Sequence, residues 1–294
     1  MNKFRYIIRV GSNCNNNCVF CWQDAISPKS LVDVAELKRI IGGITDEQSD
    51  LVFSGGEPTL HPHLFPLLSY AKEQDKFRNI LIISNGRIFS IASFLEKTIN
   101  SGATGFIISI SSFDEGIHDG MTRSPGSFKQ TVQGIKNIGD ANIPFQSNTL
   151  ILKPTIHLLP KMVEWLTSFN VSQINLGFPH LCGGARKYYN QLVPRYSDAV
   201  PFIRKSIETG EQLGVRVETE LFPPCFIPQY AHHCSKKGMP ELKVYESPDL
   251  KELKEEEDAD FINLPSCSSC KHLSHCFGLP QEYIDREGLS EFKA

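Results

Sequence analysis

The chain has 294 residues, of which 40% are hydrophobic and 21% are charged, and its formal net charge is −3 at pH 7. This composition is typical of a soluble globular protein, and the slightly acidic balance gives no case for strong nucleic-acid binding through phosphates. Charged residues interrupt the apolar start and no run approaches about 18 apolar residues, so we expect no secretory signal and no membrane span.

Apolar, β-branched runs alternate with helix-period segments from the start of the chain to residue 213. We predict strands at 6–10, 50–53, 80–84, 105–111, 145–152 and 173–178. We predict helices at 34–41, 64–73, 91–101, 127–138, 156–169 and 198–213. The window 91–101 shows the amphipathic spacing on Ile91, Phe94, Leu95, Thr98 and Ile99.

Six β–α units in a row predict parallel strands with right-handed crossovers, and therefore an α/β fold. A doubly wound sheet fits this alternation as well. The unusual polar residues fall at the carboxyl ends of the strands, where barrel active sites form. This favours a partial (β/α)6 TIM barrel.

The composition changes after a last barrel-like strand at 215–220 and becomes rich in proline, cysteine and charge. We therefore expect a barrel at residues 1–220 and a small Cys-rich C-terminal extension at 221–294. An acidic run at 255–258 is expected to face solvent.

Three cysteines, Cys14, Cys18 and Cys21, form a C-x3-C-x2-C run directly after the first predicted strand. Three thiolates can hold three irons of a [4Fe–4S] cluster and leave the fourth iron open to a ligand. A zinc loop is the alternative. Nine cysteines without a secretory signal favour metal ligands over disulfides, and so a cytoplasmic protein.

This spacing, with the aromatic Phe20 before the last cysteine, resembles the radical S-adenosylmethionine (SAM) superfamily. The resemblance implies that SAM chelates the open iron, that the cluster donates one electron, and that a 5′-deoxyadenosyl radical takes a hydrogen from the substrate. It also implies a partial barrel. We expect a flavodoxin- or ferredoxin-type electron donor.

Further segments follow in the order that the family shows. Gly55-Gly56-Glu57-Pro58 resembles the GGE(P) motif, whose backbone and glutamate hold the SAM amino group. Segments at the ends of the third, fourth and fifth predicted strands resemble its ribose and carboxylate contacts, although ordinary turn and strand residues are the alternative. The expected SAM-binding residues are Phe20, Gly55, Gly56, Glu57, Pro58, Ser84, Asn85, Ser109 and Asn148.

A second cysteine run near the end of the chain, Cys267, Cys270 and Cys276, has the spacing C-x2-C-x5-C. It resembles part of the SPASM and twitch extensions, which implies an auxiliary [4Fe–4S] cluster. We expect Cys225 as the fourth ligand, because it directly follows the last barrel-like strand. A zinc site with four cysteines, or with three cysteines and a nearby histidine, is the alternative.

Two cysteines remain, Cys182 and Cys234. Each is a candidate hydrogen donor to a substrate radical, and the alternative for each is a buried apolar side chain. The first hypothesis for function is modification of a ribosomally made peptide. A radical SAM epimerase or rearrangement enzyme acting on a sugar or other small molecule is the second, and an inactive, metal-stapled binding protein is the third.

Overall fold

The computed structural model describes residues 4–22, 30–235, 241–246, 251–252 and 261–292. The acidic run at 255–258 lies outside the described residues. Among the described helices, none combines the length and the apolar character that crossing a membrane requires.

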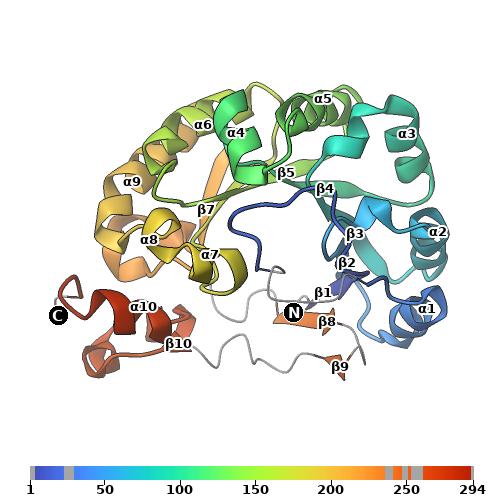
Figure 1. Ribbon diagram of the computed structural model, residues 1–294. Helices are drawn as coiled ribbons and strands as arrows, with labels where there is room; N and C mark the ends of the chain where they lie inside the picture. Colours follow the sequence, from blue (N-terminus) through green and yellow to red (C-terminus); the bar gives the residue numbers. More distant parts are fainter. Residues whose placement is uncertain (1–3, 23–29, 236–240, 247–250, 253–260, 293–294) are drawn as a thin grey trace.

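A nine-stranded sheet forms the framework, in the order β7-β6-β5-β4-β3-β2-β1-β8-β9. Its strands are β1 (Phe4–Arg9), β2 (Ser49–Ser54), β3 (Phe77–Ser84), β4 (Gly105–Ser109), β5 (Phe145–Leu150), β6 (Gln173–Gly177), β7 (Arg216–Glu220), β8 (Glu241–Glu246) and β9 (Lys251–Glu252). Strands β1 to β7 are parallel and follow chain order, β8 adds in parallel outside β1, and β9 is antiparallel to β8. The sheet curls, with helices along its outer side (Figure 1). The predicted α/β fold, a partial TIM barrel, is confirmed.

The helices are α1 (Val34–Gly43), α2 (Leu64–Glu73), α3 (Ala92–Asn100), α4 (Glu115–Thr122), α5 (Ser127–Asp140), α6 (Leu159–Thr167), α7 (Gly183–Lys187), α8 (Tyr189–Leu192), α9 (Tyr196–Leu213) and α10 (Gln281–Glu287). Short 3₁₀ segments are η2 (Pro58–Leu60), η3 (Arg87–Ser90), η4 (Ile156–Leu158), η5 (Pro224–Phe226), η6 (Pro228–His233), η8 (Pro265–Ser269) and η9 (Leu273–His275). Helix α1 begins after Asp33, whose carboxylate accepts from the Ala35 amide at 2.8 Å. Ile91, expected on the buried face of the third helix, instead precedes α3 and is 51% exposed.

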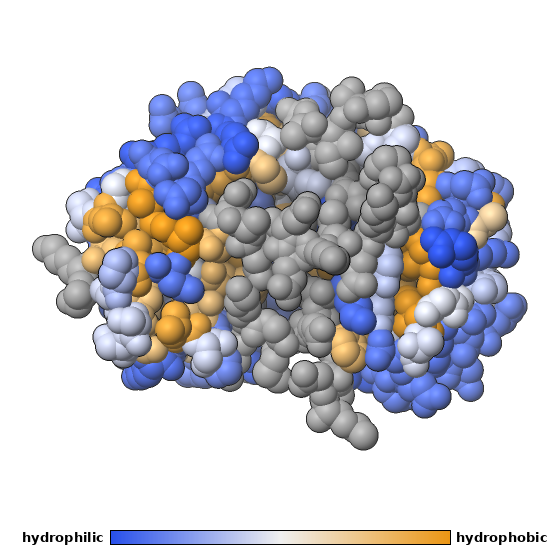
Figure 2. All heavy atoms as spheres, turned by 90° about the horizontal axis from the view of Figure 1, so that it is seen from below, coloured by the Kyte–Doolittle hydropathy of each residue, from blue (hydrophilic) through white to orange (hydrophobic). Residues whose placement is uncertain are grey.

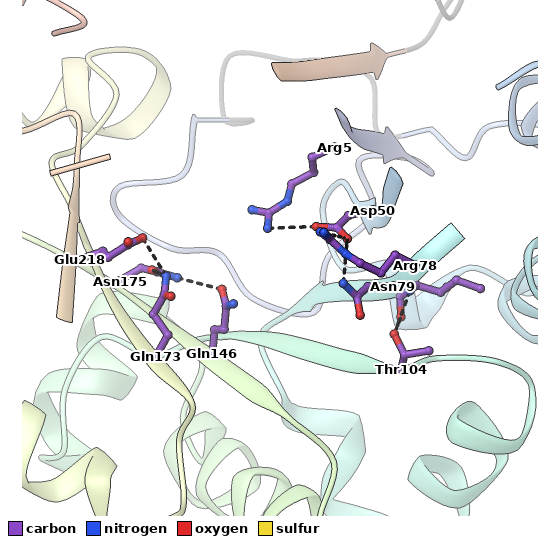
Figure 3. A network of polar contacts seen from close by, with 10 residues as sticks. Arg5, Asp50, Arg78, Asn79, Thr104, Gln146, Gln173, Asn175 and Glu218 are labelled. Atoms are coloured by element: carbon purple, nitrogen blue, oxygen red, sulfur yellow. Dashed lines mark hydrogen bonds and ion pairs between the residues drawn. The ribbon is translucent and has the colours of Figure 1, made fainter. Parts of the chain in front are cut away.

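The two faces of the strands differ in polarity. In β5, Phe145 and Ser147 are buried, whereas the alternate residues Gln146 and Asn148 are half-buried. Figure 3 shows polar side chains from both halves of the sheet pointing toward its inside. The apolar core therefore lies between the sheet and the helices, and the inner face is polar.

Two hydrogen-bonded groups make up this inner face. On β5 to β7, the Asn175 amide nitrogen donates to Asn148 at 2.9 Å, and that of Gln173 donates to Glu218 at 2.9 Å. Near β1 to β3, the Asp50 carboxylate binds a guanidinium nitrogen of Arg78 at 2.6 Å, as drawn in Figure 3.

The residues after 220 divide between two places. Strands β8 and β9 extend the barrel sheet beyond β1, whereas residues 261–292 lie beside α8 and α9 (Figure 1). Strand β10 (Phe261–Ile262) pairs with β11 (Leu279–Pro280), and α10 follows. Seen from below, apolar residues gather on the side where α8 and α10 lie (Figure 2). The boundary at residue 220 stays a prediction.

Candidate functional site

The loop after β1 lies at the carboxyl ends of the parallel strands and carries three half-buried cysteines, Cys14, Cys18 and Cys21. Its backbone is tied to the loop after β2. The Gly56 amide donates to the Gly11 carbonyl at 2.8 Å, and the Glu57 amide donates to the Asn13 carbonyl at 2.7 Å. The cysteine loop and the Gly-Gly-Glu-Pro loop thus form one backbone-linked unit.

The two glycines of that second loop permit the close approach. Gly55 has a φ of +132°, and a Cβ atom there would lie 2.3 Å from the Gly11 carbonyl oxygen. A Cβ atom on Gly56 would lie 2.4 Å from the Asn13 carbonyl oxygen. No side chain fits either position, so the Gly-Gly pair is required by its contact with the cysteine loop.

A second Gly-Gly pair approaches the cysteine loop after β6. The Gly184 amide donates to the Cys21 carbonyl at 2.8 Å, and a Cβ atom on Gly184 would lie 2.2 Å from the Val19 carbonyl oxygen. Gly183 has a φ of +48° and equally close backbone contacts. Sequence reasoning missed this pair, although two adjacent glycines a few residues after a predicted strand are a usable signal.

Glu57 is buried, at 3% exposure, and its carboxylate accepts four hydrogen bonds from neighbouring residues. The donors are the Ser84 hydroxyl at 2.9 Å, the Asn85 amide at 2.8 Å, and the amide and hydroxyl of Thr59. Burial raises the pKa of Glu57, and these four hydrogen bonds oppose that shift. The carboxylate therefore joins the ends of β2 and β3, and its contact with SAM stays a prediction.

Two residues after β3 bind the cysteine loop directly. The Asn85 side chain donates to the Asn15 side chain at 2.6 Å. The Arg87 guanidinium donates to the Asn16 side chain at 2.7 Å and to the Ser124 hydroxyl at 2.9 Å. Asn85 was predicted as a site residue, but Arg87 was missed. Its signal is a cation next to the predicted Ser-Asn-Gly element.

The C-terminal end of α4 supports the same loop from a third direction. The Asn17 amide donates to the Thr122 carbonyl, and the Val19 amide donates to the Met121 carbonyl, both at 2.9 Å. Free carbonyls at a helix end are available for such bonds. The loop is thus held by segments that follow β2, β3, β4 and β6.

The three thiols of the loop share one environment. Burial and the neighbouring Cys14 and Cys21 thiols raise the pKa of Cys18 to about 12. The Asn16 amide donates to the Cys14 sulfur at 3.4 Å. Converging thiols in a backbone cradle fit a thiolate-bound cluster, whose iron would displace the thiol protons.

The remaining expected SAM-binding residues occupy different positions. Ser109 is exposed at the end of β4 and pairs in register with Asn148 on β5. Phe20 is half-buried in the cysteine loop, and Pro58 is buried at the start of η2. Their contact with SAM stays a prediction.

The C-terminal cysteines come together with a residue far away in sequence. Burial raises the pKa of the Cys225 thiol to about 11, and the other three thiols, Cys276, Cys270 and Cys267, raise it as well. The His272 amide donates to the Cys270 sulfur at 3.5 Å, and the Gly278 amide donates to the Cys276 sulfur at 3.3 Å. The expected fourth residue thus shares the environment of the C-terminal run.

In the described part of the chain, no three cysteine sulfurs lie within 4.8 Å of one another as a group. Four thiolates around one tetrahedral zinc, with bonds of about 2.3 Å, would lie about 3.8 Å apart.

The two remaining cysteines lie in different surroundings. Cys182 is half-buried and precedes α7, next to the Gly183–Gly184 pair that contacts the cysteine loop. Cys234 is buried against β7, and burial raises its pKa to about 11. Of the two, only Cys182 is adjacent to that loop in the structure.

Comparison with known proteins gives a family match. The family model described as the radical SAM superfamily matches residues 8–166. An AdoMet-dependent heme synthase of Methanosarcina barkeri is 29% identical over 156 residues, which are 52% of this chain and 44% of that protein. A GTP 3′,8-cyclase of Cronobacter sakazakii is 25% identical over 175 residues, 56% of this chain and 52% of that protein. The chain spans about half the length of these curated relatives.

Solved structures show the same fold at low identity. Streptococcus suis SuiB bound to S-adenosylmethionine is 14% identical with a TM-score of 0.70, covering 97% of this chain and 75% of that chain. The protein anSMEcpe with bound AdoMet and a peptide, Kp18Cys, is 15% identical with a TM-score of 0.67, covering 99% and 96%.

Proposed function

The chain belongs to the radical SAM superfamily, and on that premise we propose that it cleaves SAM reductively to abstract a hydrogen atom from a peptide substrate. The observation that carries this proposal is the loop of Cys14, Cys18 and Cys21, clamped between two Gly-Gly pairs at the carboxyl edge of the sheet.

The three cysteines of this loop are the proposed ligands of a [4Fe–4S] cluster. When bound, the cluster and SAM supply one electron and a 5′-deoxyadenosyl radical. The chain's own residues fix the loop: Gly56 and Gly184 bind its backbone, and Arg87 binds its asparagines. The polar loop ends after β2 to β5 are the proposed surroundings of SAM.

The C-terminal residues 221–294 are proposed to hold an auxiliary [4Fe–4S] cluster on four ligands, Cys225, Cys267, Cys270 and Cys276. The environment that the four thiols share supports this assignment. Such a cluster would accept or return an electron.

A peptide substrate is supported by the polar inner face of the sheet. The side chains of Gln146, Asn148, Gln173 and Asn175 both donate and accept hydrogen bonds, as a peptide backbone does. Streptococcus suis SuiB has been solved bound to the precursor peptide SuiA, and anSMEcpe with bound peptides.

One observation favours epimerisation as a second candidate function. Cys182 lies next to the clamp on the cysteine loop, where a thiol can return a hydrogen atom to a substrate radical. Replacing Cys182 with alanine would then stop turnover but leave SAM cleavage intact. Uptake of one deuterium from deuterated water supports epimerisation, whereas a loss of two hydrogens supports crosslinking.

The decisive experiment is anaerobic reconstitution followed by dithionite and SAM. We expect about eight irons per chain and release of 5′-deoxyadenosine. Cys18→Ala should abolish release and keep about four irons in the C-terminal site. About four irons with one zinc in the wild-type protein would contradict the auxiliary cluster, and no release would favour an inactive binding protein.

A further inference from the structure

A third group of metal-ligating side chains lies away from both cysteine sites. Glu211 is in the last turn of α9, and His232 and His233 end η6. Their ligand atoms all lie within 4.8 Å of one another, and no other such group of three occurs among the described residues. The group sits where α9 and η6 meet, on the outer side of the sheet next to β7.

The contacts of His233 orient its ring. Its Nδ1 atom lies 2.7 Å from the Val217 carbonyl oxygen, which can only accept a hydrogen bond. Nδ1 therefore carries a proton, and Nε2 is the ring atom that faces Glu211. Nε2 lies 3.3 Å from a carboxylate oxygen of Glu211. A proton or a metal ion can be held between these two atoms.

The separation suits a metal ion as well as a proton. Two ligands bound to one tetrahedral ion at about 2.1 Å lie about 3.4 Å apart, close to the observed 3.3 Å. A histidine that binds a metal typically donates its other ring N–H to a carbonyl, as His233 does to Val217. The ring of His232 offers a third ligand nitrogen, and its centroid lies 4.3 Å from that of His233.

Burial and backbone contacts hold His233 in position, whereas Glu211 is exposed and can adjust. His233 is held against β7, because the next residue but one, Ser235, donates its amide to the Thr219 carbonyl at 2.8 Å. The His233 side chain is 11% exposed, whereas that of Glu211 is 51% exposed. An ion can therefore reach a preformed histidine from solvent and draw in the other two ligands.

We propose that Glu211, His232 and His233 bind one divalent ion of the Zn²⁺ class. Two imidazoles and one carboxylate are donors that suit zinc, and water would complete its coordination. The bound ion links η6 to α9. Segment η6 directly follows η5, which carries Cys225. The site thus anchors the segment that reaches from the barrel to the C-terminal cysteines.

The test is zinc binding by the anaerobically reconstituted protein, whose cysteine sites are already filled. Zinc is added as the chloride, the protein is desalted, and zinc and iron per chain are measured by mass spectrometry. We expect about one zinc per chain with iron unchanged, and at least tenfold weaker zinc binding in Glu211→Gln and in His232→Gln. Zinc should also raise the melting temperature of the wild-type protein and not that of these variants.

Asp198→Asn is the matched control, since it removes the same charge from an exposed position in the first turn of α9, at the opposite end of the helix from Glu211. Both test variants alter exposed side chains, so loss of folding does not confound them. The proposal is overturned if the reconstituted protein binds no zinc. It is equally overturned if Glu211→Gln and His232→Gln bind zinc as the wild-type protein does. Neither readout depends on SAM cleavage.

Discussion

Gly56 contacts the cysteine loop so closely that even a methyl group would collide with it. Its Cβ position lies 2.4 Å from the Asn13 carbonyl and 2.6 Å from the Ser12 carbonyl, and both are backbone atoms that cannot rotate away. We expect Gly56→Ala to displace the loop and to lower iron binding by about four per chain after reconstitution.

The control for this prediction is Gly43→Ala. Gly43 ends α1, and no atom lies within 4 Å of the position that its Cβ would take. This variant should keep its full iron content and should not lose stability, because alanine favours a helix more than glycine. Equal iron in both variants would show that the glycine contact does not govern the site.

His118 is a buried residue that makes stability depend on pH. It is 1% exposed, its Nδ1 atom accepts from the Ser111 amide at 3.3 Å, and its Nε2 atom has no hydrogen-bond partner among the described residues. Burial lowers its pKa to about 4. The unfolded chain therefore binds the proton more readily than the folded protein does.

From this shift we expect the free energy of unfolding to fall by about 3 kcal/mol as the pH drops from about 6.5 to about 4. Urea titrations across this range measure the slope. In His118→Gln the contribution should vanish, because the side chain no longer titrates. A variant with the wild-type slope would assign the pH dependence to other groups.

At the scale of elements, the strands and most helices follow from local pattern. Short apolar, β-branched runs such as 51–53 and 80–83 identify strands without any knowledge of their neighbours. Strand β8 was missed, although 241–246 alternates, because its pairing with β1 joins residues more than 200 apart. The local alternation does not indicate that this strand pairs with β1 at the edge of the sheet.

The residues of the site also divide into those that a local sequence motif predicts and those that only the fold brings together. Cysteine spacing and the Gly-Gly-Glu-Pro segment mark the loops, because each is contiguous in sequence. The clamp from Gly184 and the bond from Arg87 to Asn16 join elements that only the curled sheet brings together. The carboxylate of Glu57 illustrates a further limit, since its residue type was predicted but its partners, Ser84 and Asn85, were not.

The turns η5 and η8 yield a prediction about the C-terminal cysteines. Cys225 shares the environment of all three cysteines of the C-terminal run, Cys267, Cys270 and Cys276. Cys234 is buried against β7, and of these three thiols Cys276 also raises its pKa. We expect Cys225→Ala to lose the metal of this site, about four irons per chain, and to keep the cluster of the N-terminal loop. Iron analysis with electron paramagnetic resonance of the reduced protein separates the two clusters.

Cys234→Ala is the matched control, as a second cysteine from the same stretch. It should retain all of the iron and lose only the stability of one buried apolar side chain. If instead Cys234→Ala loses the metal and Cys225→Ala keeps it, the fourth ligand is Cys234 and not Cys225.

On the scale of the whole molecule, the C-terminal segment and the barrel share one apolar core. Tyr283 of α10 is fully buried, with its ring 4.7 Å from that of Tyr196 in α9 and 5.9 Å from that of Phe178 after β6. Its hydroxyl accepts from the Tyr196 amide at 3.0 Å and also binds Glu291. Residues of the predicted C-terminal extension therefore contribute to the packing of the barrel.

This shared core predicts that a destabilising substitution in α10 also lowers the stability of the barrel. Tyr283→Ala removes a buried ring and should lower the free energy of unfolding by about 4 kcal/mol. Tyr283→Phe keeps the ring and should cost about 1 kcal/mol. Both tryptophans, Trp22 and Trp165, precede residue 220, so their fluorescence follows the barrel alone during anaerobic denaturation. If the C-terminal segment unfolded independently, Tyr283→Ala would leave the tryptophan transition unchanged. If the core is common, the midpoint of this transition shifts to a lower denaturant concentration, in proportion to the lost packing.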